Sequence, residues 1–77
     1  MNDWEFDNGV WIRPLAVGGR TMLWRFTADP RVINSTRWIL DVNRTGQMTE
    51  RWKEFEARGA EDAMAIAEAH LSLEGLI

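Results

Sequence analysis

Residues 21–27, TMLWRFT, decide how this sequence can fold. Read with the period of two that a β-strand imposes, one side of the stretch carries Met22, Trp24 and Phe26. The other side carries Leu23 and Arg25, so it is not uniformly polar. The first side predicts a buried core. The second predicts a sheet face with a further role, because a strand that simply faces water alternates cleanly between apolar and polar residues.

Strand patterns also precede this stretch. Residues 3–7, DWEFD, alternate between acidic and aromatic side chains, which is typical of a half-buried strand. The Asn8-Gly9 pair that follows supplies the positive φ angles of a tight hairpin, and residues 10–13, VWIR, return as a second strand. Pro14 has no backbone N–H to donate, so we expect this strand to be short, bulged or at a sheet edge there.

After the turn at Gly18-Gly19, the opening stretch predicts a third strand over residues 21–28, which Asp29-Pro30 ends. Residues 31–35 predict a loop. Residues 36–43, TRWILDVN, alternate again and predict a fourth strand. Residues 43–46, NRTG, have the composition of a hairpin turn.

Residues 48–56, MTERWKEFE, are ambiguous between strand and helix. Trp52 and Phe55 are three positions apart, which suits one face of a helix. A strand with a bulge, or one with Trp52 on the outer face, is the alternative. We favour the strand because a hairpin turn precedes it.

A helix is predicted over about residues 60–74, which are rich in the helix formers Ala, Met, Glu and Leu. Glu61 and Asp62 in its first turn complement the positive end of the helix dipole. At 100° per residue, half of the helical wheel is occupied by one apolar arc. The arc contains Ala60, Ala63, Met64, Ile66, Ala67, His70, Leu71 and Leu73.

These elements predict an α+β fold in one domain spanning residues 1–77. A four- or five-stranded antiparallel sheet, within about residues 3–56, packs one face against the C-terminal helix. The expected core combines the apolar arc of the helix with residues of the strands. Those strand residues are Trp4, Phe6, Met22, Trp24, Phe26, Trp38, Leu40 and Val42.

The composition places the chain in the cytoplasm. The chain has no cysteine and so forms no disulfide, which fits the reducing cytoplasm. With 77 residues, it is close to the lower size limit for a domain that is held together by its core alone. The five tryptophans and three phenylalanines must supply that stability by packing. We expect no secretory signal, because the first residues lack a basic segment followed by an apolar run. We expect no membrane contact, because no stretch is long enough to span a bilayer.

The residues that carry catalysis are scarce, so we expect a protein that is not an enzyme. With one histidine and no cysteine, a metal site on imidazole or thiolate groups is not expected. His70 lies within the apolar arc, where a structural role explains it. The glycines at 18 and 19 lack the further glycines and the lysine of a phosphate-binding loop, and no cofactor is expected.

The second sheet face is the candidate binding surface, because one helix covers only one face. We expect it to carry an apolar and cationic patch made of Trp11, Arg13, Leu23, Arg25, Arg37 and Ile39. Tryptophan and arginine often anchor protein interfaces. Alternatively, Arg13, Arg25 and Arg37 pair with cross-strand neighbours such as Glu5 or Asp41, or the face closes a homodimer.

The charges favour a protein partner over nucleic acid. The net charge is −3, and residues 50–77 hold seven acids against three bases. An acidic surface that includes Glu54 and Glu61 could engage a basic protein, one that itself processes nucleic acid. A small nucleic-acid-binding sheet using Trp11, Arg13, Arg25 and Arg37 is the alternative, and the overall acidity disfavours it.

Three segments give the chain its general type: residues 3–13, DWEFDNGVWIR; 37–47, RWILDVNRTGQ; and 57–71, ARGAEDAMAIAEAHL. A short acidic domain of this kind, without cysteine, resembles the small phage-encoded inhibitor proteins of the anti-CRISPR type. The resemblance implies a stoichiometric binder that inhibits a host nucleic-acid-targeting complex by occlusion. Those proteins share no common set of functional residues, so the resemblance assigns no site.

Overall fold

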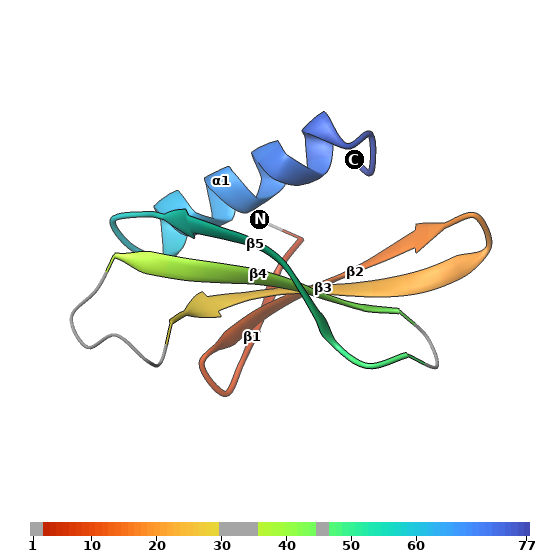
Figure 1. Cartoon of the computed structure of the whole chain (residues 1–77), viewed down its shortest axis with the longest axis horizontal. Helices are drawn as coiled ribbons and strands as arrows, with labels where there is room; N and C mark the ends of the chain where they lie inside the picture. The colour runs from red at the N-terminus through yellow and green to blue at the C-terminus, as the bar shows by residue number, and fades with distance from the viewer. Residues whose placement is uncertain (1–2, 30–35, 45–46) are drawn as a thin grey trace.

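The computed structural model describes residues 3–29, 36–44 and 47–77. It contains five strands, β1 (Glu5–Asp7), β2 (Val10–Val17), β3 (Arg20–Ala28), β4 (Arg37–Arg44) and β5 (Glu50–Glu56), followed by α1 (Ala60–Leu73). The strands form one antiparallel sheet in chain order, and α1 lies across one side of it (Figure 1). The predicted α+β architecture is confirmed, with five strands. The loop predicted at 31–35, and Thr45 and Gly46 of the last predicted turn, lie outside the described residues.

Two tight turns set the register of the first three strands. Asn8 and Gly9 have φ angles of 50° and 82°, and Gly18 and Gly19 have 60° and 80°. Positive φ at both central positions is the conformation whose twist matches that of the flanking strands. The sequence signal at Asn8-Gly9 therefore predicted both the turn and its geometry.

Pro14 lies within β2, which is longer than the sequence predicted. Strand β1 pairs only with Val10, Trp11 and Ile12. From Arg13 onward β2 is therefore an edge strand, while its other side pairs with β3 as far as Val17. An edge tolerates a residue that has no N–H to donate. Of the alternatives predicted at Pro14, the edge is therefore the one observed, and the short strand is wrong.

The ambiguous segment is strand β5, and it contains a bulge. Lys53 lies opposite Leu40 and Arg51 opposite Asp41, so Trp52 is the extra residue of the pair. Its ring lies 4.8 Å from that of Trp24 and 6.4 Å from His70 of α1. The bulge thus brings Trp52 to the side that carries the helix, which accounts for an aromatic spacing of three within a strand.

The core lies between α1 and the strand face that carries Trp24. Trp24, Phe26 and Leu40 are almost completely buried, as are Ala63 and Ala67 of the helix. The small side chains of these two alanines allow α1 to approach the sheet closely, and the aromatic rings fill the space around them. Trp4 packs edge-on against Phe26 with ring centroids 4.9 Å apart.

Two residues expected in the core are exposed. Phe6 is 61% exposed because β1 is a three-residue edge strand, in which the ring contacts Trp11 on one side only. Leu73 is 84% exposed. The buried stripe of α1 is centred on Ala67. Leu73 follows Ala67 by six positions and therefore lies about 120° around the helix from it, away from the sheet.

Hydrogen bonds of the backbone N–H groups mark both ends of α1, to a side chain at the start and to carbonyls at the end. At the start, the backbone N–H of Arg58 donates to Asp62 Oδ2 at 2.9 Å. At the end, Gly75 has a φ of 74°. Its N–H donates to the carbonyl of Ser72, and that of Leu76 donates to Leu71. This pair of bonds is a Schellman motif, and Leu76 folds back against the core cluster.

Candidate interaction surface

The side of the sheet opposite α1 is the candidate surface, and we call it the open face. Directly opposed residues of an antiparallel pair share a face, and the register places Ile12, Arg25, Asp41 and Arg51 in one row. Neighbouring rows complete the surface. The open face comprises Glu5, Asp7, Val10, Ile12, Pro14, Ala16, Thr21, Leu23, Arg25, Thr27, Arg37, Ile39, Asp41, Asn43, Arg51, Glu54 and Glu56.

Two ion pairs lie on the open face, one between β3 and β4 and one within β5. Arg25 Nη2 lies 4.0 Å from Asp41 Oδ2, and Arg51 Nη1 lies 2.7 Å from Glu54 Oε1. Burial raises the pKa of Asp41 above its ordinary value, although the guanidinium groups of Arg25 and Arg51 act in the opposite direction. Arg25, which was predicted to contact a partner, and Arg51, which was not, are thus each paired with a carboxylate of this face.

Apolar side chains lie beside these ion pairs. Val10, Ile12 and Pro14 of β2 reach the open face, as does Leu23, which is 38% exposed. Ile39 also lies on this face, as predicted, but it is only 5% exposed. It therefore supports its neighbours by packing and offers a partner little area.

Leu23, Arg25, Arg37, Ile39 and Glu54 are all brought to the open face. Arg37 lies opposite Glu56 at one end of it and is exposed. Glu61 does not join them, because it lies exposed in the first turn of α1, on the other side of the sheet.

Trp11 and Arg13 were expected on the open face, and that expectation is wrong. Trp11 lies opposite Phe26 and Arg13 opposite Trp24, so both share the face of the core. The Trp11 ring stacks on Phe26 at 6.1 Å. The segment Val10 to Arg13 carries apolar residues at both alternating positions, and only pairing with β3 decides which of them face α1.

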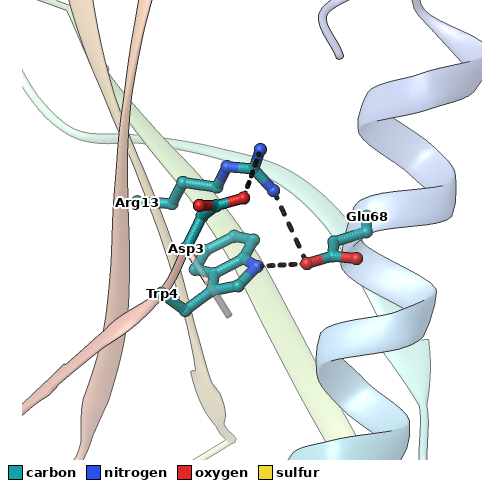
Figure 2. Close-up of polar contacts among 4 residues, drawn as sticks. All are labelled: Asp3, Trp4, Arg13 and Glu68. Carbon is teal, nitrogen blue, oxygen red and sulfur yellow. Dashed lines mark hydrogen bonds and ion pairs between the residues drawn. The ribbon is translucent and has the colours of Figure 1, made fainter. Parts of the chain in front are cut away.

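Arg13 of β2 instead lies under the helix, where it contacts both the N-terminal residues and α1 (Figure 2). Its guanidinium lies 3.3 Å from Asp3 Oδ2 and 3.5 Å from Glu68 Oε1, and its side chain is 14% exposed. It also lies over the Trp4 ring, 6.0 Å from the centroid. The Trp4 indole N–H donates to the same Glu68 oxygen at 3.0 Å. Arg13 is thus a structural residue that links β2 to α1.

Sequence reasoning missed Val10, Ile12, Pro14 and Arg51 as members of the open face. Val10, Ile12 and Pro14 alternate with Trp11 and Arg13 along β2. The sequence therefore showed that one of the two sets faces α1, but it did not show which. Arg51 could not be placed without the bulge, because an unbroken strand would put it on the same face as Lys53 and Phe55.

The described ranges contain no group of three or more His, Asp or Glu side chains arranged to hold a metal ion. Within the same ranges, no helix has both the length and the apolar character needed to cross a membrane. No family model, curated protein or solved structure matches the chain.

Proposed function

We propose that this chain is a non-enzymatic protein-binding module and that its open face contacts the partner. The observation that carries the proposal is the row of apolar residues Val10, Ile12, Pro14 and Leu23, which no described element of the chain covers. Apolar groups beside a polar, charged surface are the composition of a protein interface with an apolar centre and a polar rim.

The charges of the open face support a protein partner over nucleic acid. Five carboxylates, those of Glu5, Asp7, Asp41, Glu54 and Glu56, share this face with three guanidinium groups, those of Arg25, Arg37 and Arg51. Two of these arginines form ion pairs with carboxylates there. Such a surface repels a phosphate backbone, whose binding depends on several uncompensated cations.

The likeness to small acidic phage-encoded inhibitors supplies the class of activity. In this proposal the chain binds a host nucleic-acid-targeting complex stoichiometrically and inhibits it by covering a working surface. An acidic, mixed-charge face suits a protein surface that is itself basic because it binds nucleic acid.

The test compares two exposed leucines on opposite sides of the molecule. Leu23 lies on the open face, and Leu73 lies on α1. Leu23→Asp should abolish capture of the host partner and relieve inhibition, whereas Leu73→Asp should leave both unchanged. Equal capture by both variants would remove the open face from the proposal.

Two further measurements separate the alternatives. Labelled DNA and RNA should show no binding in fluorescence anisotropy at about 50 mM salt, where a multi-phosphate contact is strong. Salt-sensitive binding that Arg25→Glu removes would favour the nucleic-acid module. In sedimentation velocity, a dimer that Leu23→Asp dissociates would show that a second copy covers the face.

A further inference from the structure

A small pocket is lined by the end of β2, the start of β3 and the end of β4. Figure 1 shows that this end of the sheet is the one away from the start of α1. Its volume is about 180 Å³. Its described lining consists of Val17, Arg20, Thr21, Met22, Arg44 and Gln47. Arg20 and Met22 share the alternation of Trp24, and Val17 and Arg44 lie opposite them, so these four side chains lie on the helix side of the sheet, whereas Thr21 has the opposite alternation.

Two guanidinium groups line this pocket. Arg44 Nη1 donates to Glu50 Oε2 at 2.9 Å, which leaves its other N–H donors available. Arg20 is exposed, and it forms no ion pair or hydrogen bond with a side chain in the described ranges. Among the described residues no side chain occupies its guanidinium donors, which leaves them available to an anionic ligand.

The remaining lining determines the size and nature of a ligand. Val17 and Met22 contribute apolar surface, and Val17 is 37% exposed. No carboxylate appears among the described lining residues, so the pocket disfavours cations. Its volume is below the roughly 300–1,000 Å³ of sites for drug-sized ligands and cofactors, which restricts the ligand to a single side chain or a comparably small group.

We infer that this pocket binds the carboxylate side chain of an acidic protein segment, with an adjacent apolar side chain against Val17 and Met22. The planar guanidinium of Arg20 suits bidentate binding of a carboxylate. Two arginines, one already paired to Glu50, are too few for a nucleic-acid backbone. Its two guanidinium groups lie on the helix side of the sheet, so its occupant differs in charge from the basic partner proposed for the open face.

The test is a titration of the ¹⁵N-labelled chain followed by two-dimensional NMR. The probes are N-acetyl-Glu-Leu-amide, the neutral isostere N-acetyl-Gln-Leu-amide, and inorganic phosphate. The Glu peptide should give saturable shifts confined to amides around Arg20, Met22 and Arg44. The Gln peptide should bind roughly tenfold more weakly, the loss expected when a charge-assisted contact becomes neutral.

Matched variants locate the site. Arg20→Gln should weaken binding of the Glu peptide by a similar factor. Arg58→Gln removes the same charge at the opposite end of the sheet, beside Glu56 and Asp62, and should change nothing. Val17→Thr keeps the shape of the side chain but removes apolar contact, so it should weaken binding of the Glu-Leu peptide.

Three results would overturn the inference. These are equal affinity for the Glu and Gln peptides, unchanged binding in Arg20→Gln, and phosphate binding at the same amides with the same affinity. The last result would identify a general anion site. Spectra of each variant without ligand show whether it is folded, so that loss of binding is not confused with loss of structure.

Discussion

Trp4 donates its indole N–H to Glu68 Oε1 at 3.0 Å, and this bond joins the first described residues to the middle of α1 across 64 positions of the chain. Trp4 is 4% exposed, so water cannot readily replace the acceptor. Arg13 binds the same oxygen from β2. Glu68 is therefore the acceptor that ties the N-terminal segment, the sheet and the helix together (Figure 2).

Glu68→Ala should lower the free energy of unfolding by about 1–2 kcal/mol, because it leaves the indole N–H and the Arg13 guanidinium without this acceptor. The partial exposure of Glu68 keeps the expected loss at the lower end of the range for buried groups. Urea denaturation measures it. Glu5→Ala, at an exposed position of β1, should change stability by less than about 0.5 kcal/mol. Equal effects of the two substitutions would show that Glu68 contributes no more than a surface charge.

Ala67→Leu should destabilise the protein by about 1–3 kcal/mol, because Ala67 is completely buried where α1 approaches the sheet. The added carbons have no space there and must push the helix away. Ala69→Leu makes the same change at an exposed position of α1, where little effect is expected. The measurement is thermal unfolding followed by circular dichroism. If both variants melt together, the helix does not pack as closely as the burial of Ala67 indicates.

The stability of the protein should depend on pH through Asp41. Burial raises the pKa of Asp41 in the folded state above its unfolded value, so the folded state binds this proton more tightly. The contribution of Asp41 is therefore greatest at low pH and is lost as pH rises from the ordinary aspartate pKa through the raised value.

Asp41→Asn cannot titrate, and it should remove this component. Urea unfolding of both proteins at a series of acidic to neutral pH values measures the difference. The stability of the wild type relative to Asp41→Asn should fall as pH increases across that window. A relative stability that increases with pH would mean that the ion pair with Arg25, and not burial, dominates the pKa of Asp41.

Pro14→Val should promote self-association through the edge of β2. The two-residue turn at Asn8 and Gly9 makes Asp7 and Val10 a hydrogen-bonding pair, so alternation directs the backbone groups of Val10, Ile12 and Pro14 to the side of β1. Beyond β1 no described strand pairs with that side of β2, and proline removes one of its backbone donors.

Sedimentation velocity over a range of concentrations measures this effect. Pro14→Val should form dimers at concentrations where the wild type does not. The double variant Pro14→Val/Ala16→Pro moves the missing donor to the next outward position, and it should return toward the monomer. A Pro14→Val protein that stays monomeric at every concentration would show that other features protect this edge.

Much of the fold was predictable because it follows from local rules. Alternation in residues 21–27 and 36–43 gives strands by itself, and Asn8-Gly9 and Gly18-Gly19 have backbone conformations that permit few alternatives. The helix boundaries were also close, since helix formers begin after Gly59 and the buried stripe recurs every four residues. Each of these features depends on neighbours along the chain.

Membership of the candidate surface depended on partners distant in sequence. The phase of β2, which places Trp11 and Arg13 under the helix and Ile12 on the open face, is set by pairing with β3. The bulge at Trp52 places Glu50 and Arg51 on the opposite faces from those they would have in an unbroken strand. At the bulge, Trp52 packs on Trp24 and lies near His70.

By itself, then, the sequence determined the elements, their order and most of the core, because backbone geometry and hydrophobic periodicity act over a few residues. Only the tertiary structure decided which arginines are paired, which apolar side chains remain uncovered, and that Arg20 lines a pocket with Arg44. Those outcomes depend on register, where a shift of one residue exchanges the two faces of a strand.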